Sequence, residues 1–441
     1  MRFFRNVLGT LLTEVLIVLF NLLIGVLTAR LLGPTRRGVL TLVMTLPVTL
    51  VALTDLGISQ ANIYFIARQK RRAAPVAANG VYLALGIGLL VGLGLWLARG
   101  VALGTVLRSM PARYFGFVLV LAPVLLLYTY WMAILRAFRR FALFNLLRLL
   151  MPASLLGMML LALLVFHGGI GWATAAYGAG IVVAAGLSLA VVGAFVRPDL
   201  RPDWGLMKES LLYGFKSYLQ NLVGHLIYRL DIYLVAFFLT PPEIAFYGIA
   251  TSVAEMVWYI PNSVGLVLFP KLSAAEESEV HQLTAEVCRH TLLVTALAGV
   301  AVLAAGVVGI PLLYGAEYAP AVRPLILLVP GTTMMTLYKV LARNFSSRNR
   351  QQVSILAATV GLVLNGVLDW FLIPRLGMVG AALGSTLAYS AAGLVLLWSF
   401  RRESGLGLGD ALRLRRSDLI RYRELVQSVR ARLAAVGGGK R

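Results

Sequence analysis

The chain has 441 residues, of which 59% are apolar and only 13% are charged, and its formal net charge at pH 7 is +22. A soluble globular protein carries about a quarter charged residues, so this composition excludes an ordinary soluble enzyme. The apolar residues fall in blocks of about twenty, the length that crosses a hydrocarbon core of ~30 Å, and the basic residues lie between the blocks. The sequence therefore predicts a multi-pass membrane protein whose partners are anionic lipids, not nucleic acid.

The first apolar block starts in the segment MRFFRNVLGTLL and continues to about Leu32 without a small-residue cleavage site. A secretory signal has a shorter apolar region that ends at such a site, so we expect a retained first span. Charged, Pro and Gly clusters divide the chain into twelve predicted helices. Their approximate ranges are 7–32, 38–66, 77–98, 113–137, 142–167, 171–196, 211–238, 243–269, 287–313, 321–342, 353–374 and 378–400.

Orientation follows from the Lys and Arg residues in the short loops, which favour the cytoplasmic side of a membrane. With the N-terminus inside, 17 of them lie in inner segments before residue 401 and 7 in outer loops. This excess predicts a protein of the bacterial or archaeal cell (inner) membrane with both termini in the cytoplasm. The seven outer residues are Arg36, Arg37, Arg99, Arg108, Arg113, Arg323 and Arg375.

One constant offset of 207 residues aligns the first six predicted spans with the second six. Parallel six-helix repeats predict two lobes, residues 1–200 and 201–400, around a central cavity that opens alternately to either face as the lobes rock. The aligned pairs are Leu32 and Leu239, Pro34 and Pro241, Pro123 and Pro330, Arg136 and Arg343, and Phe138 and Phe345.

The third region, residues 401–441, is a basic cytoplasmic tail with 11 basic and 4 acidic residues. Its apolar residues recur at roughly helical spacing, so it forms an amphipathic helix that lies on the inner leaflet or packs on the protein. The run from Gly405 to Gly409 follows no strand, which makes it a hinge and not a nucleotide loop. A single cysteine, Cys288, excludes an intramolecular disulfide, and we expect no metal site and no cofactor. The apolar residues of the tail are Leu412, Leu419, Leu425, Val429 and Leu433.

Ionisable residues within spans are costly, so each should face the cavity, pair, or reach water at a span end. Arg229 lies about 27 Å into its span and His225 precedes it by one turn, so we expect both on one face, contacting an anion. Asp231 points elsewhere and is expected to pair with another helix or to couple transport to an ion. Glu255 is either a proton or sodium site or the counter-ion of Arg229.

Glu14 and Asp55 lie toward the cytoplasmic half of the first two spans, where protonation would couple transport to an ion gradient or a static pair with Arg or Lys would hold them. Lys339 and Arg343 stack one turn apart near an inner span end, where they would collect phosphate, although the positive-inside rule alone would place them there.

Three further charged residues, Lys216, Arg148 and Asp369, lie within about two turns of predicted span ends, and we expect them to snorkel to the interface. Asn221 and Asn262 supply uncharged hydrogen-bonding groups at mid-membrane depth. Such groups suit a sugar, but ordinary helix packing uses the same residue types.

The segment from Ala29 to Pro34, followed by Gly38, resembles the end of the first span in polysaccharide and O-antigen flippases. The segments 231–239, 247–250, 260–261 and 269–273 resemble their spans 7 and 8, and the likeness extends to about residue 400. The family belongs to the multidrug/oligosaccharidyl-lipid/polysaccharide exporter superfamily. Lipid II flippases of this superfamily usually have two further spans, which makes the peptidoglycan precursor a less favoured substrate.

The resemblance implies an all-α protein of two six-helix lobes that moves an undecaprenyl-pyrophosphate-linked oligosaccharide from the cytoplasmic to the outer leaflet, as a monomeric transport unit. Cationic cavity residues would hold the pyrophosphate, and Arg30 is carried over from the motif itself. The predicted substrate-binding residues are Arg30, Asn221, His225, Arg229, Asn262, Lys339 and Arg343. The ion-coupling candidates are Glu14, Asp55, Asp231 and Glu255.

Two other functions compete with glycan transport. A multidrug or cation antiporter of the same fold needs an anionic cavity, and the five basic and five acidic residues of the predicted spans do not decide between them. A membrane glycan polymerase needs acid or base groups at a water-facing site, and the longest predicted outer loop, Arg99 to Arg113, has no acid. We therefore expect a transporter and not an enzyme.

Overall fold

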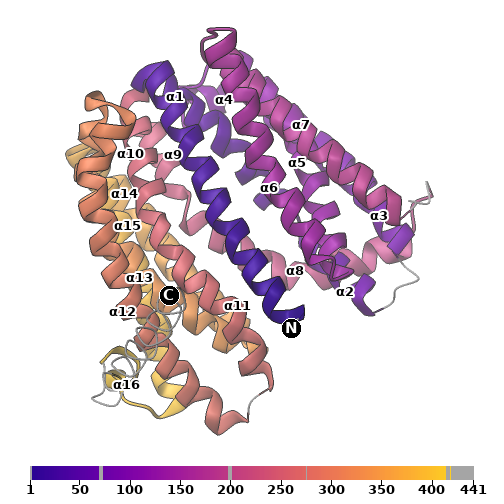
Figure 1. Cartoon of the computed structure of the whole chain (residues 1–441), viewed down its shortest axis with the longest axis vertical. Coiled ribbons are helices and arrows are strands. Elements are labelled where there is room, and N and C mark those ends of the chain that lie inside the picture. Colours follow the sequence, from indigo (N-terminus) through magenta and orange to yellow (C-terminus); the bar gives the residue numbers. More distant parts are fainter. Residues whose placement is uncertain (1, 69–72, 197–200, 275, 414–417, 419–441) are drawn as a thin grey trace, which may run out of the picture.

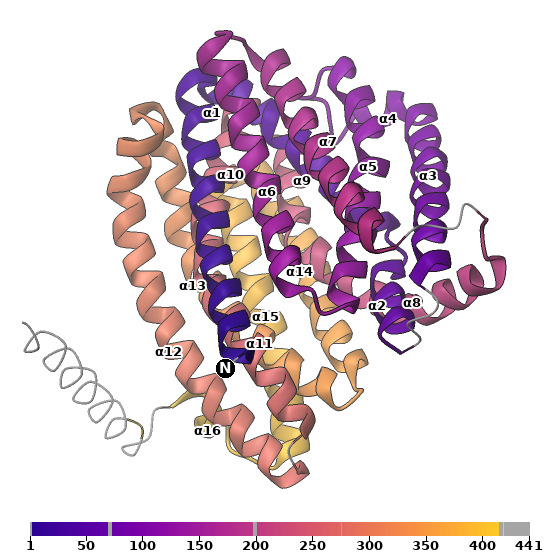
Figure 2. The same ribbon diagram turned by 45° about the vertical axis from the view of Figure 1, so that its right-hand side comes forward.

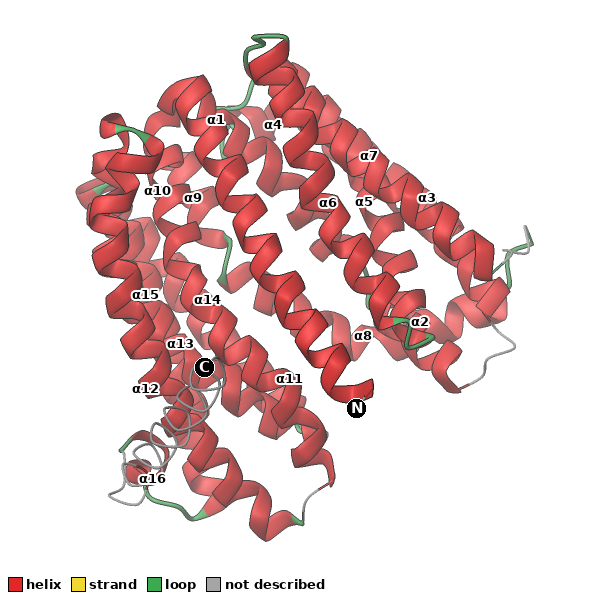
Figure 3. Cartoon of the chain, viewed as in Figure 1, coloured by secondary structure: helices red, strands yellow, loops and turns green. Residues whose placement is uncertain are grey.

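The computed structural model describes residues 2–68, 73–196, 201–274, 276–413 and residue 418 (Figure 1). These residues form helices joined by short turns, and no strand occurs among them (Figure 3). The predicted all-helical membrane architecture is confirmed at this level. The tail helix predicted beyond Leu412 lies outside the described residues, apart from Asp418.

The N-terminal group of helices comprises α1 to α7. Their bounds are α1 (Arg2–Thr54), α2 (Ile58–Arg68), α3 (Ala73–Leu97), α4 (Arg99–Gly104), α5 (Ala112–Ala137), α6 (Phe141–Leu160) with the π-helical turn η2 (Leu161–Val165), and α7 (Ile170–Phe195).

The C-terminal group follows the same order of long helices. It comprises α8 (Trp204–Ile227), α9 (Leu230–Phe238), α10 (Pro241–Ala254), the 3-10 turn η3 (Glu255–Trp258), α11 (Tyr259–Ala274), α12 (Glu277–Gly309), the turns η4 (Ile310–Tyr314) and η5 (Ala316–Ala321), α13 (Val322–Ser347), α14 (Gln351–Leu376), α15 (Met378–Ser404) and α16 (Leu408–Leu412).

Helix α1 is two helices that meet at Gly33, whose φ of 71° and ψ of 170° are not helical. Glycine tolerates this positive φ, and Pro34 suits the first turn of the helix that restarts after it. Figure 1 shows the chain rising from the N-terminus to the label of α1 and returning to α2 near its starting level. We name the end of the bundle at Gly33, Thr240 and η4 the apex, and the end at the N-terminus, α2 and α16 the base.

Nine helices in the described part are long and apolar enough to cross a membrane, or ten if the bent pair Ser217–Ile227 and Leu230–Phe238 is one span. The prediction of twelve spans differs for two reasons. The kinked α1 contributes one candidate span of 43 residues, Leu12–Thr54, which contains most of the first predicted span and most of the second. The predicted span 243–269 is divided by η3 into two shorter helices.

Three pairs of long helices, α5 and α13, α6 and α14, and α7 and α15, begin 210, 210 and 208 residues apart, close to the offset of 207 between the aligned residues. Both α5 and α13 have 26 residues, and Pro123 and Pro330 lie inside them. Helix α7 packs on α5 and α6, as α15 packs on α13 and α14. Figures 1 and 2 agree in placing α3 and α7 on one side of the molecule and α12 and α13 on the other.

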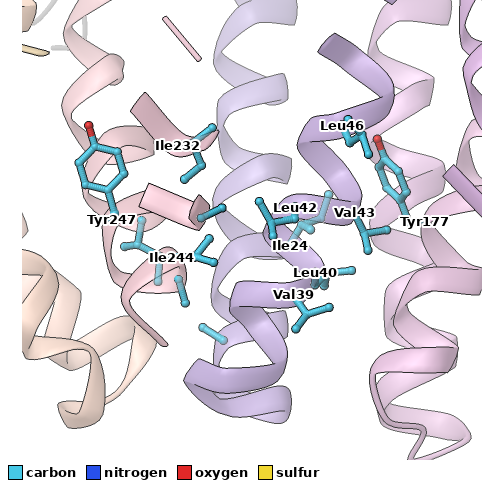
Figure 4. Close-up of a cluster of buried hydrophobic side chains, with 14 of the residues drawn as sticks. Ile24, Val39, Leu40, Leu42, Val43, Leu46, Tyr177, Ile232, Ile244 and Tyr247 are labelled. Atoms are coloured by element: carbon cyan, nitrogen blue, oxygen red, sulfur yellow. The ribbon is translucent and has the colours of Figure 1, made fainter. Parts of the chain in front are cut away.

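The two groups meet near the apex in a shared apolar core. Leu40 and Val43 of α1 lie in the same buried cluster as Ile232 of α9 and Ile244 of α10 (Figure 4). At Gly38 the backbones are so close that an added Cβ would lie 1.7 Å from the carbonyl oxygen of Pro241. Two further apolar cores lie nearer the base: one consists of residues of the C-terminal group, and the other joins the N-terminal group to Leu206 of α8. We name the contact of α1 with α10 at the apex the seam.

The outer surface of the helices is apolar, as contact with lipid requires. Large apolar side chains are exposed along α3, α7 and α12, for example Leu90 at 72% and Val300 at 66%. A water-soluble monomer rarely exposes apolar patches of this extent. This surface confirms a multi-pass membrane protein.

The start of the tail packs on α12. Helix α15 ends at Gly405, which has a φ of 69°, and α16 then lies against α12. The guanidinium of Arg289 on α12 donates to both carboxylate oxygens of Asp418, at 2.7 and 2.9 Å. His290 on α12 also lies close to this carboxylate, with its Nε2 3.5 Å from Oδ1 of Asp418.

Candidate functional site

A cavity of about 430 Å³ lies between the two groups on the base side of the seam. Its walls come from α1 of the N-terminal group and from α10, η3 and α11 of the C-terminal group, with the Tyr314 ring of η4 at its apex end. The lining residues that can form ionic or hydrogen bonds are Asn21, Arg37, Arg229, Ser252, Glu255, Trp258, Tyr259, Asn262 and Tyr314.

Arg37 lines this cavity, which corrects the prediction that it lies in an outer loop. The chain forms no loop there, because α1 resumes directly after Gly33 and carries Arg37 one turn into the second helix. Its Nη1 lies 3.8 Å from the sulfur of Met44, and its buried Nε has no hydrogen-bond partner. Arg37 therefore offers the cavity a cation that is paired with no carboxylate of the described residues.

Arg229 also lines the cavity, as predicted, but it is already paired. Its two guanidinium nitrogens donate to the two carboxylate oxygens of Glu255, at 2.8 and 3.2 Å. The sequence left Glu255 as an ion site or a counter-ion, and in this structure it is the counter-ion. The pair contributes two polar groups and no net charge to the cavity wall.

A second compartment of about 330 Å³ continues toward the base between α8 and α13, and Asn262 lines both compartments. The ammonium of Lys339 lies over the rings of Tyr228 and Trp258, at 4.8 and 4.5 Å from their centroids. It also donates to Oδ1 of Asn262 at 3.4 Å. The other predicted binding residues here are Asn221, His225 and Arg343.

His225 and Arg229 do not share one helical face, contrary to the prediction. The helix ends at Ile227 and restarts at Leu230, and the two parts are bent by 42°. His225 consequently faces the second compartment, where its Nε2 lies 3.0 Å from the hydroxyl of Thr49 on α1. This hydrogen bond links the two groups of helices.

Arg30 lies at the apex and is not among the residues that line either compartment. Its guanidinium donates to the backbone carbonyls of Leu312 and Leu313 in η4. Tyr318 donates to the carbonyl of Ala29 at 3.1 Å beside it. These hydrogen bonds hold the part of α1 before Gly33 against η4 of the C-terminal group. The predicted contact of Arg30 with substrate remains a prediction.

Two ion-coupling candidates lie within the N-terminal group. Glu14 of α1 accepts from Arg148 of α6 at 2.6 and 3.0 Å, which is the static pair considered for Glu14. The same pair shows that Arg148 has a partner and does not merely snorkel. Asp55 lies between α1 and α2, where its Oδ1 accepts from the Ser59 hydroxyl at 2.5 Å.

Asp231 lies in a buried polar cluster of the C-terminal group. Its Oδ2 accepts from the hydroxyls of Tyr247 at 2.6 Å and Ser385 at 3.1 Å. The amide of Asn365 lies 3.4 Å from the Ser385 hydroxyl and 3.2 Å from Oδ2 of Asp369. All five side chains are at most 1% exposed.

The prediction that Asp369 snorkels is wrong, because α15 covers it completely. Its Oδ1 has no hydrogen-bond partner, and neither has Oδ1 of Asn365. An ionised carboxylate that is buried without a partner is costly. A proton or a small cation bound at this cluster would lower that cost. No local pattern predicts this cluster, since Asp231, Tyr247 and Ser385 come from three other helices, α9, α10 and α15.

The charges of the two compartments decide what they can hold. Their lining includes the cations Arg37, Arg229, Lys339 and Arg343, and only one acid, Glu255. Arginine and lysine donors in a partly desolvated cavity bind phosphate strongly. The site is therefore suited to an anion flanked by hydroxyl-rich groups, for which Asn21, Ser252 and Asn262 offer partners.

The fold and the cavity define a multi-pass membrane transporter. The chain belongs to the polysaccharide biosynthesis protein family, which it matches over residues 3–276. It is 22% identical over 390 residues to a Shigella flexneri protein named as an O-antigen transporter, covering 85% of this chain and 92% of that protein. It is also 22% identical to a Haloferax volcanii protein named as a low-salt glycan biosynthesis flippase, over 48% of this chain and 45% of that protein.

Solved structures show the same fold at low sequence identity. The lipid II flippase MurJ, in an inward closed conformation, matches with a TM-score of 0.73 and 15% identity, over 88% of this chain and 86% of that chain. An inward-facing multidrug resistance transporter of the MATE family matches with a TM-score of 0.71 and 16% identity, over 88% and 94%. An outward-facing one matches with 0.63 and 16% identity, over 91% and 95%.

Proposed function

We propose that the protein is a flippase that moves a polyprenyl-pyrophosphate-linked oligosaccharide from the cytoplasmic to the outer leaflet for cell-surface polysaccharide biosynthesis. The observation that carries the proposal is the excess of cations in the cavity between the two groups of helices. A pyrophosphate and its glycan cannot cross hydrocarbon unaided. The polyprenyl chain needs no such path, because it is as apolar as the lipid.

In this proposal each cationic residue binds the pyrophosphate at a different distance from the base. Lys339 and Arg343 near the base collect the pyrophosphate, and Arg37 holds it beside the seam. The neutral pair of Arg229 and Glu255 lies between them and bonds to sugar hydroxyls. Asn221 and Asn262 add further sugar contacts.

The finer architecture is twelve spans in two six-helix lobes with both termini in the cytoplasm. The equivalent positions of α5 and α13, α6 and α14, and α7 and α15 support the two lobes. The base then faces the cytoplasm, and the closed seam makes this an inward-facing state. The higher TM-score with the inward-facing than with the outward-facing transporter of the same superfamily supports that assignment.

The cluster of Asp231, Asn365, Asp369 and Ser385 would hold the coupling ion of this cycle. Its carboxylate, amide and hydroxyl oxygens are the ligands that hard cations prefer, and two buried acids also suit a shared proton. The cluster lies in the C-terminal group, behind α9 and away from the cavity lining. Occupation of the cluster would therefore act through the position of α9, next to Arg229.

A multidrug or cation antiporter is the main alternative, because two of the matched structures are named as multidrug resistance transporters. A cationic drug would meet Arg37 and Lys339 with no free carboxylate to balance it, since the one lining acid is paired. The cavity charge therefore disfavours this function. A membrane glycan polymerase is disfavoured because the relatives bear the names of transporters and flippases.

A reconstitution experiment tests the proposal. Purified protein in liposomes should move a fluorescent polyprenyl-pyrophosphate oligosaccharide to the leaflet that an external quencher reaches, faster than protein-free liposomes do. The same liposomes should not accumulate a cationic dye along a proton or sodium gradient. Dye accumulation without glycan movement would replace the proposal with the antiporter.

A further inference from the structure

A groove separate from the cavity opens at the apex of the N-terminal group, where α5, α7 and the restarted part of α1 meet. It encloses about 480 Å³ and is lined by Arg36, Arg113, Tyr114, Gly169, Ile170 and Gly171. Arg36 and Arg37 are consecutive on a helix, so their side chains point about 100° apart. Arg37 faces the cavity, while Arg36 faces this groove.

Two guanidinium groups with no acidic partner converge on the groove. A Cβ built on Gly169 would lie 3.9 Å from Nη1 of Arg36, so the guanidinium reaches the start of α7. The guanidinium of Arg113 lies 4.8 Å from the centre of the Tyr114 ring. Among the described residues, neither arginine forms an ion pair or a hydrogen bond with a carboxylate.

The first turn of α7 adds backbone donors on the same side. This helix has 26 residues and begins after Gly169, which has no side chain to cap it. The first N–H groups of a helix have no partner within the helix and carry a partial positive charge. Helix starts of this kind bind phosphate groups.

Tyr114 gives an independent sign that the groove is built for a ligand. It is 5% exposed, and its buried hydroxyl has no hydrogen-bond partner. A Cβ built on Gly171 would lie 3.8 Å from that hydroxyl, so it sits beside the start of α7. A buried hydroxyl left unpaired costs free energy, and an anion in the groove would accept a hydrogen bond from it.

We propose that this groove is a second anion site, which binds a phosphate group at the apex of the N-terminal group. Arg36 and Arg113 supply charge, Tyr114 donates its hydroxyl hydrogen, and the backbone N–H groups of Ile170 and Gly171 complete the donor set. The apex lies at the membrane surface, where phosphate comes either from a lipid headgroup or from a soluble diphosphate. Anion binding at this groove does not require transport. The test of this site is therefore independent of the test of the proposed function.

Hydrogen–deuterium exchange of the full-length protein tests the site directly. The peptide that contains residues 170–173 is followed with inorganic pyrophosphate in detergent, and separately in nanodiscs of phosphatidylglycerol or phosphatidylcholine. A bound phosphate should slow exchange of the first N–H groups of α7. Slowing by pyrophosphate supports a soluble diphosphate, and slowing by phosphatidylglycerol alone supports a lipid headgroup.

Variants separate the site from a general charge effect. The combination of Arg36→Gln and Arg113→Gln should raise the pyrophosphate or phosphatidylglycerol concentration for half-protection at least about tenfold, and Tyr114→Phe about threefold. Arg99→Gln, at another exposed apex arginine, should leave it unchanged. All these side chains except Tyr114 are exposed, and Tyr114→Phe removes only an unbonded hydroxyl, so folding should persist. Absence of protection in both arms, or equal protection in the double variant, would overturn the proposal.

Discussion

The substitution Arg37→Gln isolates the contribution of an arginine beside the seam that forms no ion pair with a carboxylate of the described residues. The guanidinium borders the cavity beside Tyr314, and its buried Nε is unbonded. A hydrogen bond from a charged donor contributes about 1.5–3 kcal/mol. At about 1.4 kcal/mol per tenfold, the apparent affinity for the pyrophosphate headgroup should fall about 10- to 100-fold.

The same substitution should not weaken the fold. Removal of Arg37 leaves no acid unpaired, and it removes a buried N–H whose missing bond costs about 1–3 kcal/mol. The melting temperature should therefore stay the same or rise. A loss of transport together with unchanged or higher stability is the pattern expected of a substrate-binding residue.

The assay is the rate of glycan movement in liposomes as a function of the substrate concentration. Arg37→Lys keeps the charge and should retain part of the affinity, while Arg99→Gln serves as a matched control at an exposed arginine outside the cavity lining. If Arg37→Gln has the same concentration dependence as the wild type, the headgroup does not bind at this arginine.

Four further predictions concern the pairs and contacts around the cavity. Arg229→Gln alone leaves Glu255 as an unpaired anion and should abolish transport, whereas the addition of Glu255→Gln should restore part of it because the pair is neutral; a double variant as inactive as the single one would make Arg229 a direct ligand. Gly38→Val places a side chain against the Pro241 carbonyl and should destabilise the protein by about 1–3 kcal/mol. Gly116→Val, with open space around it, should not destabilise the protein. Equal melting temperatures of the two variants would contradict the close packing of α1 on α10. Glu14→Gln combined with Arg148→Gln removes a partly exposed ion pair that contributes about 1 kcal/mol or less to stability. The double variant should transport the glycan in liposomes as the wild type does. If its transport no longer depends on a proton or sodium gradient, Glu14 is a coupling residue. Asp369→Asn should remove any sodium or pH dependence of transport without changing binding of the headgroup, and an unchanged ion dependence would exclude the cluster from coupling.

The sequence predicted the helices well because their limits are local. Gly and Pro mark helix limits, as at Gly377 between α14 and α15 and at Pro241, the first residue of α10. The internal repeat stays a prediction, and two of its matched prolines, Pro123 and Pro330, lie inside the long helices α5 and α13. The predicted cavity residues Arg229, His225, Asn221, Asn262, Lys339 and Arg343 all line the two compartments.

Two features depended on contacts between distant segments and were missed. Arg37 follows a Gly-Pro pair that was interpreted as a turn in an outer loop, but Pro34 opens a new helix and carries Arg37 into the cavity. Proline at the first turn of a helix is the signal that would have shown this. The burial of Asp369 depends on Ser385 and Asn365, which no local pattern places around it.

The break between α8 and α9 could also not be predicted from the sequence. Residues 211–238 form one apolar stretch without proline, so helical periodicity extends across it. The interruption at Tyr228 and Arg229 places Arg229 opposite Glu255, a partner that lies 26 residues away. Position along a continuous helix could not predict that geometry.

Photocrosslinking of the headgroup tests the central claim most directly. A polyprenyl-pyrophosphate oligosaccharide that carries a photoreactive group on its first sugar is irradiated with the purified protein, and the crosslinked peptides are identified by mass spectrometry. Headgroup passage through the cavity predicts crosslinks within the segments 18–44 and 249–262, which contain most of the lining residues, and the loss of these crosslinks in Arg37→Gln. Crosslinks confined to the lipid-facing surfaces of α3 and α12 would contradict it.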